Sequence, residues 1–178
     1  MPSDKILVQA VLTGRKTAYG QLYDRYAPLV RAVCYDASGN LADAQDLAQD
    51  VFVRAYEKLD HLHNPDCFGK WVVGIARLRC REWRRRRSRE QNGRADLSTG
   101  AAAGVEPSDD HHPERLRRMI GRLGEKERLA LHAFYLQGKS ADEARRLVGL
   151  SRSGFYRMLG RARKQLEKLL AQELEDLR

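Results

Sequence analysis

The chain has 178 residues, which suits one medium domain or two small ones. Its 33 Lys and Arg against 24 Asp and Glu give a net charge of +9, and such an excess favours a polyanionic partner. The N-terminal apolar run is too short for a signal peptide, and no stretch approaches the roughly 20 apolar residues that cross a bilayer. The composition therefore predicts a protein without membrane insertion.

The positive charge is concentrated in one segment. Residues 61–95 carry 10 basic and 3 acidic side chains, a net charge of +7, against −1 for residues 1–60 and +3 for residues 96–178. Three cysteines without CxxC spacing indicate neither a disulfide framework nor a complete cysteine metal site. A reducing cytoplasm is the expected environment.

Apolar residues recur every three or four positions from residue 4 to about 87, which predicts a compact helical domain. Gly39 and Asn40 predict the turn between two antiparallel helices, and a second break surrounds Pro65. Three stripes are expected to face the core: Leu22, Tyr26, Leu29, Val30 and Val33; Leu47, Val51, Phe52, Ala55 and Leu59; Trp71, Ile75, Leu78 and Trp83.

Residues 89–112 lose this periodicity and are rich in Gly, Ala, Ser and Asp, as flexible linkers are. Helical patterns return from Pro113, with Gly138 and Gly149 at expected helix ends. The expected fold is therefore all-α, with two small helical domains joined by a flexible linker. The predicted boundaries are 1–88 for the first domain, 89–112 for the linker and 113–178 for the second domain.

The second domain contains the pattern of a helix-turn-helix: a short helix, a tight turn from Gly149 to Ser151, and a longer helix. Ser151 is expected to cap the longer helix, with Leu150, Phe155 and Leu159 facing the core. An ordinary helical hairpin with a solvated basic face is the alternative. The side chains expected to reach base edges and phosphates are Arg152, Ser153, Tyr156 and Arg157.

The segment CREWRRRRSRE surrounds Trp83 with arginines. Such a run neutralises phosphates and adds salt-dependent affinity, and an adjacent aromatic ring can stack on an unpaired base. The alternative is a solvated helix end, and core packing is the preferred interpretation of Trp71 and Trp83. The arginines are Arg81, Arg84, Arg85, Arg86, Arg87 and Arg89.

The segment DAQDLAQDVFVRAYEKL keeps a polar, partly acidic face beside its apolar stripe. In an otherwise basic chain this face is unsuited to DNA and favours a protein partner. The plain exposed side of an amphipathic helix is the alternative. The residues of this face are Asp46, Gln49, Asp50, Arg54 and Glu57.

The segments AYGQLYDRYAPLVRAV, DAQDLAQDVFVRAYEKL and WVVGIARLRCREWRRRR resemble, in this order, region two of the extracytoplasmic-function (ECF) sigma factors of the sigma-70 family. The C-terminal segment resembles their region four. This resemblance implies a sigma factor that directs promoter recognition and DNA opening, without an active site or cofactor. The implied partners are core RNA polymerase, promoter DNA and an anti-sigma factor.

The resemblance also assigns residues. Core polymerase binding falls to Asp46, Gln49, Asp50 and Arg54. Contact with the unwound promoter −10 element falls to Leu62, His63, Asn64, Asp66, Lys70, Trp71, Arg77, Arg81, Arg84 and Arg85. Contact with the −35 duplex falls to Arg152, Ser153, Tyr156, Arg157 and Arg161. The chain departs from the family pattern at Leu78, where Asn is frequent, at Arg145, where a small apolar residue is usual, and at Gly154, where Thr is frequent.

Two other classes of protein remain open at this point. A helix-turn-helix regulator of duplex operators explains the second domain equally well, but leaves the dense positive charge of residues 61–95 without a role. A nucleic-acid-processing enzyme with a metal cluster is a more distant alternative, because the HxH spacing lacks a second well-placed pair. Its ligands would be His61, His63, Asp66 and Cys67.

Overall fold

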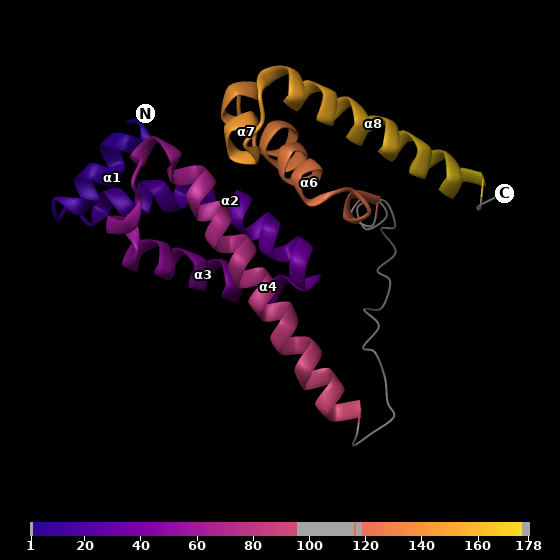
Figure 1. Cartoon of the computed structure of the whole chain (residues 1–178), viewed down its shortest axis with the longest axis horizontal. Coiled ribbons are helices and arrows are strands. Elements are labelled where there is room, and N and C mark those ends of the chain that lie inside the picture. Colours follow the sequence, from indigo (N-terminus) through magenta and orange to yellow (C-terminus); the bar gives the residue numbers. More distant parts are fainter. Residues whose placement is uncertain (1, 96–115, 117–118, 176–178) are drawn as a thin grey trace. The chain divides into compact units, whose positions relative to one another are not determined.

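The computed structural model describes residues 2–95, 116 and 119–175, and these form helices joined by short turns (Figure 1). No strand occurs among these residues, and the chain divides into two compact units between Arg89 and Glu90. The prediction of an all-α fold with two helical domains is confirmed. In the described ranges, no helix combines the length and the apolar character needed to cross a membrane.

The first unit contains four helices and two short 3-10 turns. The turn between the second and third helices forms as predicted: Gly39 has a left-handed φ of 68°, and Asn40 Oδ1 accepts hydrogen bonds from the amides of Ala42 at 2.8 Å and Asp43 at 3.1 Å. The elements are α1 (Asp4–Leu12), α2 (Thr17–Ser38), α3 (Leu41–Glu57), η1 (Leu59–His61), η2 (Pro65–Cys67) and α4 (Phe68–Ala95).

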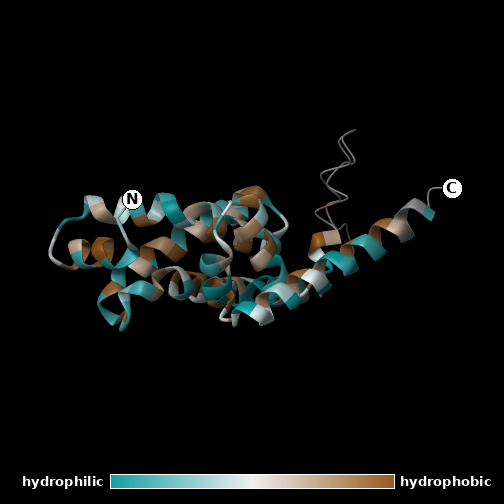
Figure 2. Cartoon of the chain, turned by 90° about the horizontal axis from the view of Figure 1, so that it is seen from above, coloured by the Kyte–Doolittle hydropathy of each residue, from teal (hydrophilic) through white to brown (hydrophobic). Residues whose placement is uncertain are grey.

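The core of the first unit lies where α2 and α3 pack against each other and against α4. The predicted stripes of α2 and α3 are buried, except that Val33 is only partly covered. Hydrophilic and hydrophobic residues alternate along the helices in Figure 2, as expected of amphipathic helices. The first two sequence stripes are therefore confirmed.

The prediction of the third stripe was wrong: the buried face of α4 is shifted by about one residue from the predicted one. Leu78 is 48% exposed, and Trp71, Ile75 and Trp83 are only partly covered. Both the predicted and the observed sets have helical spacing, so periodicity alone could not choose between them. The face of α4 that is buried consists of Phe68, Val72, Val73, Ala76 and Cys80.

Helix α4 is longer than the sequence pattern predicted. It continues to Ala95, into the segment from 89 to 112 that was expected to be a linker. Polar side chains such as those of Arg89 and Gln91 sustain an exposed helix even without an apolar stripe, because they have good intrinsic helix propensity. The remaining part of the expected linker, from residue 96, lies outside the described residues, and the domain limits stay predictions.

The second unit is built on a helix-turn-helix. Ser140 caps the first helix of this motif: its hydroxyl accepts a hydrogen bond from the Glu143 amide at 3.2 Å, and the Glu143 carboxylate accepts one from the Ser140 amide at 2.9 Å. The helix ends at Gly149, which has a left-handed φ of 72°. The elements are α6 (Glu125–Leu131), a single π turn η3 (His132–Leu136), α7 (Ala141–Val148) and α8 (Arg152–Glu175). Of the helix expected just after Pro113, residues 119–121 are described and helical.

The start of α8 follows the prediction closely. Ser151 Oγ accepts a hydrogen bond from the Gly154 amide at 3.2 Å and so caps the helix. Phe155 is fully buried and Leu159 is buried, whereas Leu150 is partly covered. Complete burial of a side chain of this size stabilises by about 1.5 to 3 kcal/mol, so Phe155 is the anchor that fixes the rotation of α8 on the unit.

Candidate functional site

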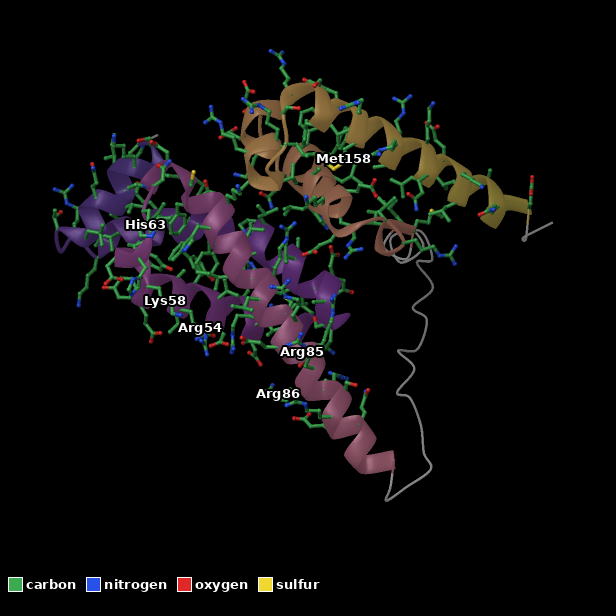
Figure 3. All side chains as sticks on the ribbon, viewed as in Figure 1. Arg54, Lys58, His63, Arg85, Arg86 and Met158 are labelled. Carbon is green, nitrogen blue, oxygen red and sulfur yellow. The ribbon has the colours of Figure 1, made fainter. Side chains whose placement is uncertain are left out.

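A groove of about 590 Å³ runs between α3 and α4 of the first unit. It contains four carboxylates and two guanidinium groups, which makes it acidic within a basic chain. Three of the four residues predicted to bind polymerase line it, and the fourth, Arg54, projects from α3 (Figure 3). The lining residues are Asp43, Asp46, Leu47, Gln49, Asp50, Val53, Arg79, Glu82, Trp83 and Arg86.

The carboxylates of this groove differ in their partners. Asp50 accepts from Arg79, whose Nε lies 2.9 Å from Asp50 Oδ2, and Arg79 also contacts Glu82. The hydrogen bond to Asp50 is the main cause that raises the pKa of Arg79 above its usual value. Asp46 is exposed and forms no ion pair with any residue that the structure describes.

A second groove, between α2 and α3, was missed by the sequence analysis. It measures about 510 Å³ and is almost entirely apolar, although Val53 and Tyr56 lie on the side of α3 that was read as polar. Two apolar residues three positions apart on a polar helix face were the available signal. The lining residues are Tyr19, Tyr23, Gln49, Phe52, Val53, Tyr56 and Glu57.

The residues of the loop between α3 and α4 that were predicted to bind DNA include both buried and exposed side chains. Leu62 is only 9% exposed and packs in the core, so its predicted role as a base-reading residue is not supported. Asn64 caps η2 by accepting from the Asp66 amide at 3.0 Å. His63, Asn64 and Asp66 are exposed, and His63 is labelled in Figure 3. In the described part of the chain, no three His, Cys, Asp or Glu side chains gather as a metal site.

The arginine run of α4 is divided between two faces. Arg84 Nε donates to the carbonyl of Ala37 at 3.3 Å, at the end of α2, and Arg87 Nη1 donates to Asp43 Oδ2 at 3.1 Å. These two arginines therefore hold α4 on the body of the unit, which differs from the role in DNA binding predicted for Arg84. An exposed stripe at helical spacing runs along another face: Lys70, Gly74, Leu78, Arg81, Arg85 and Arg89.

Two other residues assigned to the −10 element are less accessible than expected. The Nε and Nη2 atoms of Arg77 are buried, so this guanidinium does not point to solvent. Trp71 is partly covered and lies against Phe68, with ring centroids 5.9 Å apart. Helical spacing shows which residues share a face, but not which face the neighbouring helices cover.

The helix-turn-helix presents every residue predicted to contact the −35 duplex. All five lie on α8 and are exposed: Arg152, Ser153, Tyr156, Arg157 and Arg161. Their neighbours Phe155, Met158 and Ala162 are buried on the opposite side of the helix, and Figure 3 labels Met158. The leading end of α8 is therefore free to enter a major groove.

The departure predicted at Arg145 is corrected by the structure. The small apolar residue on the buried face of α7 is Ala144, which is fully buried. Arg145 instead donates from Nε to Asp142 Oδ1 at 2.6 Å, which lowers the pKa of Asp142. Gly154 lies in the first turn of α8, where a side chain would meet Ser151 Oγ at 3.1 Å, close to the capping contact.

Comparison with known proteins agrees with these two units. The profile of the family described as Sigma-70 region 2 matches residues 22–90. The ECF RNA polymerase sigma factor BldN of Streptomyces coelicolor is 29% identical over 92% of this chain. The chain is thus similar to ECF sigma factors over most of its length. The chain is also 29% identical, over 91% of its length, to the probable RNA polymerase sigma factor RfaY of Xanthomonas campestris.

The similarity extends to a solved structure. CnrH, in complex with the cytosolic domain of CnrY, superposes with a TM-score of 0.68 at 25% identity, over 96% of this chain and 99% of CnrH. The chain spans 64% of the length of BldN and 42% of that of RfaY. These comparisons support sigma factor function and not the operator-binding regulator that the helix-turn-helix left open. Sigma factors in general are not enzymes.

Proposed function

We propose that this chain is an ECF sigma factor, which binds core RNA polymerase through the acidic groove between α3 and α4 and directs promoter recognition and opening. The observation that carries this assignment is that one side of α4 borders the acidic groove formed with α3, whereas another side carries an exposed basic stripe. Arg79, Glu82 and Arg86 face the carboxylates of α3, whereas Arg81 and Arg85 belong to the exposed basic stripe. One helix thus offers a protein-binding side and a DNA-binding side.

Electrostatics separates the two sides. Phosphates approaching the groove would meet Asp43, Asp46, Asp50 and Glu82, and like charges repel. A basic helical surface of the polymerase suits this groove, because complementary charge speeds the encounter and fixes the register. DNA is left with the other exposed face of α4.

The unwound −10 strand is assigned to the exposed stripe of α4 and the adjoining loop. Arg81 and Arg85 lie one helical turn apart, and Lys70 lies near the start of the same helix. Extruding a base costs a few kcal/mol, and phosphate contacts along such a row offset that cost. His63 is an exposed ring in the loop on which a base can stack.

The −35 duplex is assigned to the leading end of α8. Arg152 and Arg157 are exposed there, and guanidinium groups recognise guanine edges through two hydrogen bonds. Tyr156 is 47% exposed beside them and provides a further donor. The two units would then read two elements of one promoter.

The partners and location follow from the same proposal. CnrH was solved with the cytosolic domain of CnrY bound, and this chain is likewise expected to bind a protein regulator, which we propose is an anti-sigma factor. Because bacterial RNA polymerase works in the cytoplasm, the chain is expected there too. The proposed role requires neither a catalytic residue nor a cofactor of its own, because the polymerase performs the chemistry.

The decisive experiment is reconstitution with bacterial core RNA polymerase. The purified chain is expected to co-elute with core and to let it open promoter DNA that core alone ignores, detected by permanganate reactivity of unpaired thymines. A library of randomised promoter sequences supplies the DNA, so that no single sequence has to be chosen in advance. Absence of association with core, with any anti-sigma factor removed, would contradict the proposal.

A further inference from the structure

Arg79 is a half-buried residue of α4 that no sequence pattern singled out. Its side chain is 22% exposed, and its Nε and Nη2 atoms both donate to Asp50 Oδ2 on α3. Its Nη1 atom donates to Glu82, one turn further along α4. A single guanidinium in the lining of the groove therefore binds carboxylates of two helices.

The remaining carboxylates of the groove are held less firmly. Asp46 is exposed and makes no ion pair with a residue that the structure describes. Asp43 pairs with Arg87, but the side chain of Arg87 is 51% exposed, and exposed pairs are screened by water and salt. Asp50 differs from them because two N–H groups of the 22% exposed Arg79 donate to its carboxylate.

We propose that Arg79 is a positioning residue that holds the Asp50 carboxylate in the orientation used to bind core polymerase. A carboxylate that is already held loses less rotamer freedom when the partner arrives. The positive charge also offsets the repulsion between Asp50, Asp46 and Glu82. This inference rests on the proposed function and adds to it a residue that need not touch the polymerase.

The chemistry of the side chain explains why arginine is required. The planar guanidinium presents several N–H groups in a rigid fork, so it satisfies Asp50 and Glu82 at the same time. A lysine at this position carries the same charge on one flexible ammonium and lacks this fork. Arg79→Lys therefore loosens Asp50 without changing the net charge of the groove.

The test is a double-mutant cycle on affinity for core RNA polymerase. The full-length wild-type chain, Arg79→Lys, Asp50→Asn and the double variant are titrated with core by fluorescence anisotropy. Arg79→Lys is expected to weaken binding about three- to fivefold, the scale of a partly exposed ion pair. In the Asp50→Asn background, Arg79→Lys is expected to have no further effect, because Arg79 acts through Asp50.

Controls separate positioning from general stability. Arg145→Lys is charge-matched and alters an Arg–Asp pair in the other unit, so it is expected to leave core affinity unchanged. The thermal midpoint of each variant is measured in parallel. A purely structural role would lower core affinity only in step with a lower thermal midpoint, and an equal effect of Arg79→Lys in both backgrounds would show that it does not act through Asp50; either result would overturn the inference.

Other outcomes are also decisive. Wild-type or tighter binding by Arg79→Lys would show that Arg79 does not position Asp50 for the polymerase. If Asp50→Asn binds core normally, the inference about Arg79 is wrong while the proposed function still stands. If the wild-type chain does not bind core, the proposed function itself is wrong, and the inference falls with it.

Discussion

Helices α4 and α8 both carry rows of arginines, but they use them differently. On α8, Arg152, Arg157 and Arg161 are all exposed and available for DNA. On α4 the arginines of the run are also exposed, but Arg84 and Arg87 donate to groups at the ends of α2 and α3. Consecutive helical residues are turned by about 100°, so a continuous arginine run is several surfaces and not one.

The two helices use their arginines differently because different contacts set the rotation of each helix about its axis. Short-range features decide the rotation of α8: Gly149 ends the preceding helix, Ser151 caps the next one, and Phe155 enters the core directly afterwards. The rotation of α4 is decided by α2 and α3, which are distant in sequence. A site on α8 is therefore easier to predict than a site on α4.

The largest expected effect concerns the groove side of α4. Replacing Asp46 and Asp50 together by Lys should weaken core polymerase binding by on the order of 100-fold, because the groove then repels a basic partner and the new ammonium at position 50 faces Arg79. Affinity is measured by titration with core, and helicity by circular dichroism. Asp60→Lys, an exposed acid outside the groove, is the matched control. Normal core binding by the double variant would remove the groove from the proposed interface.

The next effect concerns α8. Arg157→Ala should weaken binding of the holoenzyme to −35 duplex DNA by about 1 to 3 kcal/mol if it contacts a base. Arg163→Ala is the control, because Arg163 is 77% exposed on the same helix and pairs with Glu167 at 3.2 Å. For both variants, the affinity and sequence preference of the holoenzyme are measured by competition with altered −35 sequences. Equal losses for the two would mean that α8 binds DNA through charge alone.

A third comparison tests two pairs of arginines on α4, one in the exposed stripe and one in contact with the ends of α2 and α3. Ala at Arg81 and Arg85 should lower the salt dependence of single-strand binding, with a slope reduced by about 1.4 for two lost phosphate contacts. Ala at Arg84 and Arg87 should instead lower thermal stability, since it removes contacts to Ala37 and Asp43. For both double variants, salt titrations measure the slope of single-strand binding, and melting curves measure thermal stability. A reversed pattern would refute the assignment of the faces.

The smallest effect concerns the buried side of α4. Cys80 Sγ lies 3.9 Å from Cys34 Sγ, and this thiol contact, together with burial, raises the pKa of Cys34. Since the thiolate is the reactive form, Cys34 should resist alkylation at neutral pH and react only as the pH rises or the unit unfolds. Exposed Cys67 should react first with iodoacetamide. Mass mapping of the labelled cysteine checks this, and rapid labelling of Cys34 in the folded chain would contradict it.

Several parts of the candidate site were predictable because their signals are local. Gly39 with Asn40, and Gly149 with Ser151, mark helix ends through backbone geometry and capping, and both turns form as expected. The acidic face of α3 was also predictable, because an amphipathic helix with a clear apolar stripe leaves its polar residues outside. The burial of Leu62 was not predictable, because an apolar residue in a short loop gives no periodic signal of burial.

The sequence by itself determined the helical composition, the turns, and the rotation of α8, since these depend on neighbouring residues. The tertiary structure alone decided which face of α4 is buried, because that choice depends on where α2 and α3 lie. It buried Val72 and Cys80 in place of Leu78 and Trp83. It also brought Arg79 to Asp50, a contact between residues 29 positions apart that no helical spacing could predict.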